Sequence, residues 1–191
     1  NNGVQYSGAV PMAGDIITRD IAVYIQQTLG DCLENKDLET LKHDYGSAKK
    51  ECIEESNNVV LNINGKEINI NEYELADIIQ SRMTEIFQEV KRKINHNSTS
   101  NTPYGITITG GGSRLKNIEI LAQEIFEQNT IISYPKNIDG SDKIINNPRF
   151  STAIGLIKYG MKSKKNENEN EKISITSISK NLFSQLKKLY K

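Results

Sequence analysis

Three consecutive glycines mark the first place at which this sequence could bind a ligand. Residues 104–109 alternate as a β-strand does. They are followed by Gly110, Gly111, Gly112 and Ser113, after which a helical pattern begins. Glycines let a ligand approach the backbone closely, and the helix N-terminus supplies free N–H groups. The spacing matches neither a GxGxxG nor a Walker A motif. It predicts either a turn that contacts a nucleotide or a tight strand-to-helix turn.

Three charged side chains are further candidates for binding. Glu39 and Lys42 stand three residues apart in a segment that we expect to be helical. A pair at this spacing is commonly a solvated ion pair worth roughly 0.2–0.5 kcal/mol, and the functional alternative is a pair of hydrogen-bonding groups aimed at a ribose. Arg82 borders an apolar stripe on another predicted helix. It either extends its guanidinium into water or anchors a carboxylate of a partner peptide.

No residue pattern indicates a metal site or a catalytic nucleophile. Cys32 and Cys52 form no CxxC motif, and we expect both to be reduced thiols in a cytosolic protein. His43 and His96 stand apart from any Cys, Ser or acidic motif, and we expect both at the surface.

The end of the chain differs in charge from the rest. Residues 162–191 hold eight Lys and three Glu, so they carry a net charge of +5 and residues 1–161 carry −5. Residues 162–172 contain no apolar side chain, and we expect a disordered linker there. Residues 173–191 regain an amphipathic helical pattern, which is typical of an anchor on a membrane surface. A helix that docks on a partner protein and an unstructured terminus are the alternatives.

Both sides of this predicted terminal helix could contact an anionic membrane. Its apolar side holds Ile178, Leu182, Phe183, Leu186, Leu189 and Tyr190. Its flanks and opposite side hold Lys180, Lys187, Lys188 and Lys191. Each lysine near an anionic leaflet would contribute on the order of 1 kcal/mol. The residues that we expect to bind the membrane are Ile178, Leu182, Phe183, Leu186, Lys187, Lys188 and Leu189.

The overall composition excludes several classes of protein. Lys and Arg number 24, as do Asp and Glu, and this zero net charge argues against a strongly basic nucleic-acid-binding protein. Hydrophobic residues make up 36% of the 191 residues, and no apolar run approaches the roughly 18 residues of a membrane span. The polar start does not look like a secretory signal. Because the chain also begins without Met and in the middle of a pattern, we expect a fragment of a longer protein.

The elements that must position these residues can be read from periodicity. Residues 4–10 could form a short strand, and a helix should run from Gly14 to a stop at Gly30. Residues 31–56 are charged and should form short helical pieces. Residues 59–70 read as a β-hairpin around an Asn-Gly turn, in a register that pairs Leu61 with Ile68 and Val59 with Ile70.

Helical patterns dominate the remainder. Asn71 with Glu74 three residues later signals the start of a long amphipathic helix, which a polar loop over residues 96–103 should end. A helix that buries Leu115 should follow the glycines, and residues 130–134 could form a strand. Asn147-Pro148 could start a final helix, and its Ala153 and Gly155 would allow close packing on a neighbour.

Five segments, in this order, together resemble the family of FtsA, the bacterial actin-like cell-division protein. They are residues 8–22 (GAVPMAGDIITRDIA), 38–48 (LETLKHDYGSA), 82–87 (RMTEIF), 106–115 (ITITGGGSRL) and 148–160 (PRFSTAIGLIKYG). The GGGS turn alone recurs in Hsp70-like and MreB-like ATPases, whereas the other four segments make the resemblance specific to FtsA. The basic tail lies where this family keeps a membrane-targeting helix.

The resemblance implies an α/β, actin-like half-molecule of the Hsp70/actin ATPase superfamily. Residues 1–30 would be the first part of subdomain IIA, and residues 31–100 an inserted α+β subdomain IIB. Residues 101–161 would complete IIA and add a final helix that returns to subdomain IA. The disordered linker at 162–172 and the membrane-targeting helix at 173–191 would follow. The family's phosphate loops and magnesium-associated aspartates lie upstream and have no counterpart in this sequence.

The implied function is a non-enzymatic cell-division adaptor that links FtsZ filaments to the cytoplasmic membrane at the division septum. Glu39, Lys42 and the turn from Gly110 to Ser113 would contact the nucleoside of ATP, which binds with Mg in the complete protein and weakly or not at all in this fragment. The implied partners are the FtsZ C-terminal peptide at Arg82, other FtsA molecules and an anionic membrane, but no nucleic acid. The alternative is an actin-like ATPase of another system, such as pilus assembly, an MreB-like filament or plasmid segregation.

Overall fold

The computed structural model describes residues 4, 6–30, 32–63, 66–97, 105–138 and 140–165. The chain divides into two compact units, residues 1–108 with 112–132, and residues 109–111 with 133–191. This division does not separate the residues predicted for subdomains IIA and IIB, whose assignment stays a prediction. Within the described residues, no helix has the length and apolar character needed to cross a membrane. The predicted turn at Asn64-Gly65, most of the linker and the predicted tail helix lie outside the described residues.

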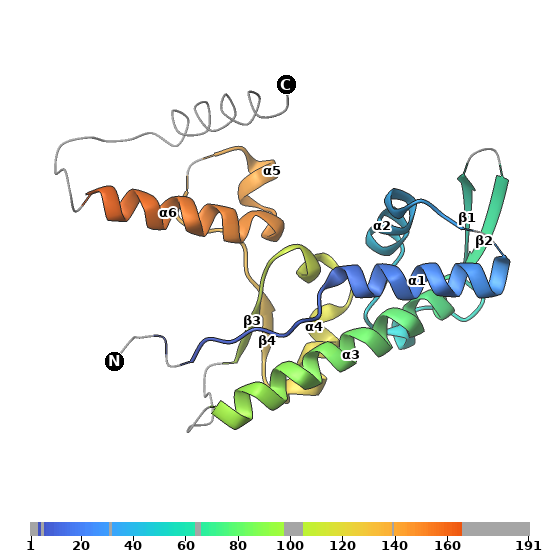
Figure 1. Ribbon diagram of the computed structural model, residues 1–191, viewed down its shortest axis with the longest axis horizontal. Coiled ribbons are helices and arrows are strands. Elements are labelled where there is room, and N and C mark those ends of the chain that lie inside the picture. The colour runs from blue at the N-terminus through green and yellow to red at the C-terminus, as the bar shows by residue number, and fades with distance from the viewer. Residues whose placement is uncertain are drawn as a thin grey trace. The chain divides into compact units, whose positions relative to one another are not determined.

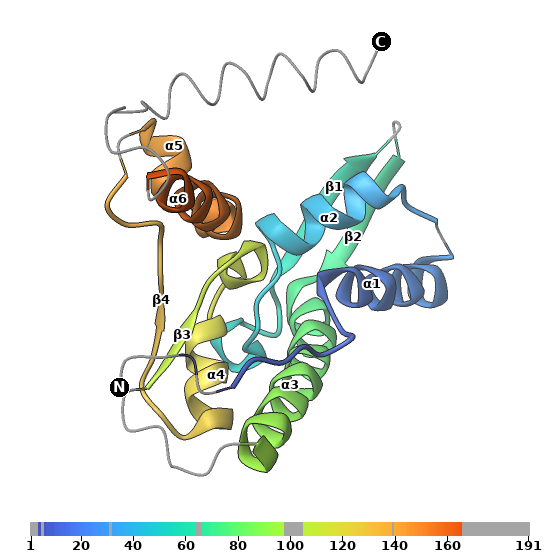
Figure 2. The same ribbon diagram turned by 60° about the vertical axis from the view of Figure 1, so that its left-hand side comes forward.

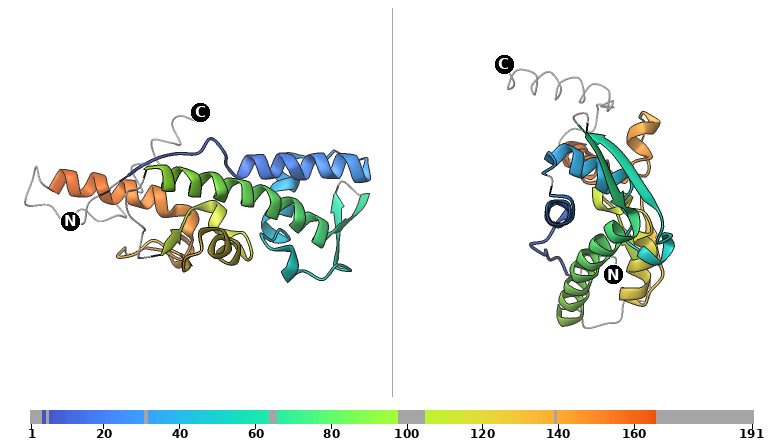
Figure 3. Two further views of the ribbon diagram at one scale, coloured as in Figure 1. Left: turned by 90° about the horizontal axis from the view of Figure 1, so that it is seen from below. Right: turned by 90° about the vertical axis from the view of Figure 1, so that its right-hand side faces the viewer.

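Two long helices, α1 (Gly14–Leu29) and α3 (Glu72–Asn97), lie side by side in the first unit (Figure 1; Figure 3, left). The predicted stop of α1 is confirmed, because Gly30 takes a left-handed conformation at φ 68° and its N–H bonds to the carbonyl of Gln26. The predicted start of α3 is also confirmed, since the Asn71 side chain accepts a hydrogen bond from the backbone N–H of Glu74 at 3.0 Å.

The segment between these helices carries short elements, as expected. It forms α2 (Asn35–Asp44), the short 3₁₀ turn η1 (Lys50–Cys52) and the hairpin of β1 (Asn58–Ile63) with β2 (Lys66–Asn71). The predicted register is confirmed, with Val59 opposite Ile70 and Leu61 opposite Ile68. Val59, Ile68 and Ile70 are buried whereas Val60 is 60% exposed, so one face of the hairpin packs on the core.

A second small sheet follows α3 in the same unit. Strands β3 (Ile106–Ile108) and β4 (Thr130–Ile132) form a parallel pair, and α4 (Ile118–Phe126) lies against them (Figure 2). Parallel strands need a crossover between them, and α4 is that crossover. Both strands fall within the predicted segments and are shorter than them.

The core of the first unit joins these elements through aliphatic side chains. The residues with at most 5% exposure in this cluster are Ile17, Ile21, Ile25, Leu38, Leu41, Ala48, Ile68, Ile70, Leu75, Ile79, Ile118, Leu121 and Ala122. In the second half of α3, Phe87 meets Phe126 of α4 with ring centroids 5.5 Å apart. The α3 side of this core was predicted by its apolar spacing.

Two expectations for the first unit were wrong. The described residues among 4–10 form no strand, because alternation alone cannot form a ladder without a neighbouring strand. The helix expected directly after the glycines is split, with a 3₁₀ turn η2 at Gly111–Arg114 and α4 beginning only at Ile118. Asn117 causes this break, since its φ of 61° is left-handed and does not continue a helix.

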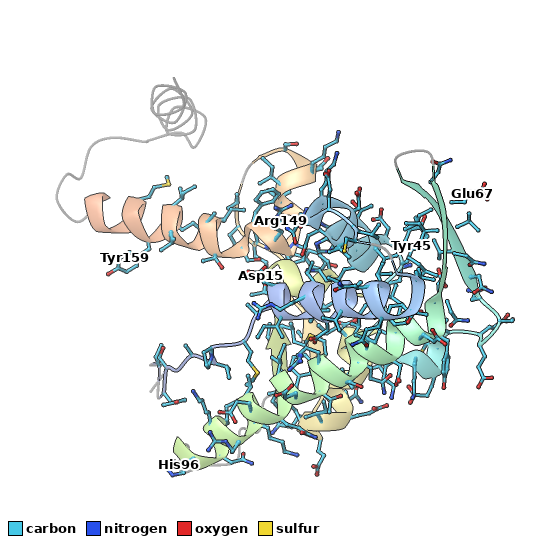
Figure 4. All side chains as sticks on the ribbon, turned by 45° about the vertical axis from the view of Figure 1, so that its right-hand side comes forward. Asp15, Tyr45, Glu67, His96, Arg149 and Tyr159 are labelled. Atoms are coloured by element: carbon cyan, nitrogen blue, oxygen red, sulfur yellow. The ribbon has the colours of Figure 1, made fainter. Side chains whose placement is uncertain are left out.

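The second unit contains α5 (Asp142–Ile145), the 3₁₀ turn η3 (Pro148–Phe150) and α6 (Ser151–Lys165). Sequence periodicity missed the four-residue α5. Pro148 opens the 3₁₀ turn, and the α-helix extends to Lys165, beyond the predicted end of the final helix. Ala153 and Gly155 are exposed, and Tyr159, which projects outward from α6 in Figure 4, is 76% exposed.

Removing buried side-chain volume from α3 should destabilise the first unit. Ile79 is fully buried and packs against the turn after α2, so Ile79→Ala should lower the free energy of unfolding by about 2–5 kcal/mol. Ile120→Ala is the control, because Ile120 is 45% exposed on α4 and its truncation should cost about 0.5 kcal/mol or less. Urea unfolding followed by far-UV circular dichroism measures both. Equal effects would contradict the packing.

Candidate functional site

A buried lysine lies at the centre of the candidate site. The side chain of Lys42 on α2 is 8% exposed. Its ammonium donates to Oε1 of Glu39 at 2.7 Å, to Oγ1 of Thr18 at 2.7 Å and to the carbonyl of Gly14 at 3.3 Å. These are as many acceptors as an ammonium has protons. The pair of Glu39 and Lys42 is therefore an ion pair, as one interpretation held, but its lysine is not solvated.

Glu39 is held by three neighbours. Its Oε1 accepts from Lys42 and from the hydroxyl of Thr18, and its Oε2 lies 3.3 Å from Nε2 of His43. Burial alone would raise the pKa of Glu39, but the hydrogen bonds from Lys42 and Thr18, with the charges of Lys42 and His43, outweigh it and hold the pKa below its usual value. Glu39 is thus an ionised acceptor whose side chain is one-third exposed, at 33%.

Local geometry explains why α1 and α2 meet at this point. The acceptors Gly14 and Thr18 lie one turn apart at the start of α1, so a single ammonium reaches both. At the other end of α2, a Cβ on Gly46 would lie 2.3 Å from the carbonyl oxygen of Lys42 and 2.7 Å from Cδ1 of Ile79. Glycine at position 46 therefore lets α2 end tightly against α3.

The segment after α2 is hydrogen-bonded to the segment after the glycine-rich turn. Ser47 forms an isolated parallel bridge with Lys116, and the N–H of Ala48 donates to the carbonyl of Lys116 at 2.8 Å. The side-chain amide of Asn117 donates to the hydroxyl of Ser47 at 2.9 Å. These bonds hold α2 and the chain following Ser113 in one unit.

The glycine-rich turn spans the boundary between the two units, and its two parts are described separately. Gly112 and Ser113 belong to the first unit, where Ser113 is buried. Gly110 and Gly111 belong to the second, where the N–H of Gly110 donates to the carbonyl of Pro148 at 3.1 Å.

Two glycines of the turn, one in each unit, have open space where a side chain would begin. A Cβ added to Gly110 or to Gly112 would meet no heavy atom within 4 Å, and Gly110 also has a left-handed φ of 96°. At Gly111 the nearest atom is Cγ of Arg149, at 3.9 Å. The assignment of Glu39, Lys42 and the turn from Gly110 to Ser113 to a nucleotide site stays a prediction.

Arg82, the predicted partner anchor, is engaged within the chain. Its Nε and Nη2 donate to the two oxygens of Asp20 on α1 at 2.6 and 3.1 Å, and its Nη1 donates to Glu85. This two-point pair joins α1 to α3. One turn further along α1, the hydroxyl of Tyr24 donates to Glu74 at 2.6 Å. Burial first, and then the bond to Glu74, raise the pKa of the Tyr24 phenol.

Sequence reasoning missed Thr18 and Asp20. Thr18 lies 24 residues from Lys42 and Asp20 lies 62 residues from Arg82, and spacing indicates only contacts within one helix or hairpin. The one indication of a role for them in the sequence was that both lie in residues 8–22, a segment that resembles FtsA. Among the described residues, no cluster of His, Cys, Asp and Glu could hold a metal ion. Cys32 and Cys52 are exposed free thiols, and His43 and His96 are exposed, as expected (Figure 4 shows His96 at the end of α3).

Comparison with known proteins agrees with the resemblance seen in the sequence. The family model described as "Cell division protein FtsA" matches residues 1–155. Cell division protein FtsA of Buchnera aphidicola subsp. Acyrthosiphon pisum is 32% identical over 183 residues, which cover 90% of this chain and 42% of the relative. Cell division protein FtsA of Escherichia coli strain K12 is 30% identical over 199 residues, which cover 97% of this chain and 46% of the relative.

Solved structures show the fold. MreB5 of Spiroplasma citri bound to ADP has a TM-score of 0.63 and 23% identity, with 83% of this chain and 47% of that chain covered. MreB 5 of Spiroplasma citri bound to AMPPNP has a TM-score of 0.64 and 21% identity, with 84% of this chain and 47% of that chain covered. The predicted α/β, actin-like half-molecule is confirmed. The chain spans less than half the length of the curated relatives described above.

Acidification should remove the contribution of Glu39 to stability. Because the folded pKa of Glu39 lies below its ordinary value of 4.5, the ionised carboxylate stabilises the fold above that pH, and this stabilisation is lost as the pH falls through the folded pKa. The difference in unfolding free energy between the parent and Glu39→Gln should therefore shrink as the pH falls below about 4.5. Urea unfolding from pH 7 to pH 3 measures it.

Thr40→Val is a matched control for this titration. Thr40 is the next residue of α2, and its hydroxyl donates to the carbonyl of Lys36 at 3.0 Å. The free-energy difference between Thr40→Val and the parent should not depend on pH. A pH-independent difference for Glu39→Gln as well would show that Lys42 and Thr18 do not hold this carboxylate.

Proposed function

Since this chain belongs to the FtsA family of cell division proteins, we propose that it is the second half of an adaptor that links FtsZ filaments to the cytoplasmic membrane at the division septum. The observation that carries this proposal is the FtsA family match over residues 1–155, followed by a tail with a net charge of +5. The adaptor works without a chemical step of its own and associates with further FtsA molecules.

ATP with Mg would bind the complete protein as a structural ligand. Glu39 and Lys42 would face the ribose, and the turn from Gly110 to Ser113 would lie along the nucleoside. Two observations support this assignment: the open backbone at Gly110 and Gly112, and the ADP and AMPPNP bound to the MreB structures of the same fold. These residues address only the nucleoside end, so the isolated 191-residue chain should bind ATP weakly or not at all.

The FtsZ C-terminal peptide would dock beside α3. Apolar side chains of such a peptide would lie along the helix, and an acidic group would approach Arg82. A guanidinium has five N–H donors, of which three are used by Asp20 and Glu85. The side chain of Arg82 is 27% exposed, and its remaining donors can serve a carboxylate of the peptide. In this arrangement Asp20 holds the guanidinium in position for the partner.

Replacing Arg82 should weaken the binding of the peptide. A charge-assisted hydrogen bond contributes roughly 1.5–3 kcal/mol, so Arg82→Ala should lower the affinity for an FtsZ C-terminal peptide about ten- to a hundred-fold. Arg82→Lys should recover part of it, because lysine lacks the planar fork. Fluorescence anisotropy with a labelled peptide measures the affinities.

Asp20→Asn separates docking from folding in this experiment. This substitution removes the charge that pairs with Arg82 but keeps the guanidinium, so it should lower the affinity for the peptide less than Arg82→Ala does. Circular dichroism of each variant checks that α1 and α3 still pack. Unchanged affinity in a folded Arg82→Ala variant would contradict the docking site.

The tail would bring the protein to the cytoplasmic face of the membrane. Its apolar side would insert between lipids while its lysines contact anionic headgroups. Replacing both Phe183 and Leu186 with Glu should therefore abolish binding to vesicles that contain phosphatidylglycerol. Flotation or co-sedimentation with the vesicles measures this, and circular dichroism reports whether the rest of the chain remains folded.

A control with the same charge change isolates the apolar contribution. Asn181→Glu with Ser184→Glu adds the same two negative charges at polar positions of the predicted helix, and it should weaken vesicle binding without abolishing it. Neutral phosphatidylcholine vesicles should bind the parent more weakly than anionic ones. Equal binding of the parent to both vesicle types would contradict the contribution of the lysines.

A further inference from the structure

A threonine hydroxyl is buried between two charged groups at the start of α1. Thr18 is 4% exposed. Its Oγ1 accepts from Nζ of Lys42 at 2.7 Å and donates to Oε1 of Glu39, and it lies 3.2 Å from the carbonyl of Gly14. A threonine in a helix commonly bonds only to the carbonyl four residues earlier. Here the same hydroxyl also bridges a buried ammonium and a carboxylate.

This contact occupies one of the two carboxylate oxygens of Glu39. Oε1 accepts from both Thr18 and Lys42. Oε2 lies 3.3 Å from Nε2 of His43, whose side chain is exposed. The Lys42 side chain is 8% exposed and the Glu39 side chain 33%, so the ammonium is enclosed whereas the carboxylate is partly exposed. A carboxylate tied at one oxygen by two donors has little freedom to rotate.

We propose that Thr18 is a positioning residue that makes the site select a ribose over a deoxyribose, by holding Glu39 through Oε1 so that Oε2, beside His43, can accept a hydrogen bond from a sugar hydroxyl. This inference rests on the proposed nucleotide site. Thr18 itself does not touch the sugar. Without its hydroxyl, Glu39 keeps the ion pair with Lys42 but gains rotational freedom, so its bond to the sugar hydroxyl weakens.

The binding test uses the complete protein of which we propose this chain to be the second half. Calorimetry compares ATP with 2′-deoxy-ATP and 3′-deoxy-ATP. The parent should bind at least one deoxy analogue about tenfold more weakly than ATP. Thr18→Val, which has the same shape without the hydroxyl, should bind ATP about three- to tenfold more weakly and the deoxy analogues almost unchanged, so the preference for ribose is lost.

Two variants make the result specific to the hydroxyl. Thr18→Ser keeps it and should restore the ribose preference. Thr40→Val deletes a hydroxyl next to Glu39 in sequence that bonds only locally to Lys36 in the structure, and it should leave the preference intact. If Thr18→Val keeps the parent's ratio of ATP to deoxy-ATP affinities, the positioning role is overturned while the nucleotide site stands. If the parent binds no ATP, the proposed nucleotide site fails and the inference fails with it.

A second measurement needs no nucleotide and uses the 191-residue chain. Carbon-13 NMR of the Glu39 carboxyl follows its titration directly. Because the Thr18 hydrogen bond is one of the causes that lower the pKa of Glu39, Thr18→Val should raise that pKa and Thr18→Ser should not. An unchanged titration in Thr18→Val would show that the hydroxyl does not hold the carboxylate, and it would overturn the proposal independently of ATP.

Discussion

The geometry of the candidate site depends on one buried ammonium. An isolated charge is costly to remove from water, and Lys42 is stable in the interior because Glu39, Thr18 and the carbonyl of Gly14 accept its three protons. Those acceptors come from two helices, so the requirement to satisfy the lysine fixes the start of α1 against α2. Glu39 is ionised and oriented as a consequence. The acceptor that we propose for a sugar hydroxyl is thus positioned by the same bonds that join the helices.

The other proposed contact surface shares α1. Asp20 and Tyr24 project from this helix to Arg82 and Glu74 on α3, while Thr18 and Gly14 meet Lys42 on α2. A change at the nucleoside side that shifted α1 would also act on the pair that orients Arg82. The position of α1 between the two sets of contacts gives the proposed ATP and FtsZ sites a shared structural element. The aliphatic residues Ile17, Ile21 and Ile25 of the same helix are buried.

The fold was largely predictable from the sequence because its main elements depend on local rules. Period-two alternation around Asn-Gly specified the β1–β2 register, and the apolar spacing after Asn71 specified α3. Local rules failed where a partner distant in sequence decides the outcome. Alternation over residues 4–10 did not give a strand, and Asn117 separated η2 from α4. At the site, Glu39 and Lys42 were found from family motifs, but the burial of Lys42 depends on Thr18, and the pairing of Arg82 depends on Asp20. Neither contact follows from spacing.

The enclosure of Lys42 can be observed directly by nitrogen-15 NMR of the lysine side chains in the 191-residue chain. Ammonium protons exposed to water exchange too fast to be seen near neutral pH, whereas three hydrogen bonds in a buried setting slow their exchange. The account predicts a slowly exchanging ammonium signal that disappears in Lys42→Arg and remains in Lys36→Arg, a change at an exposed position of the same helix. If Lys42 instead exchanged as fast as Lys36, the ammonium would be solvated, and neither the oriented Glu39 nor the site built on it would stand.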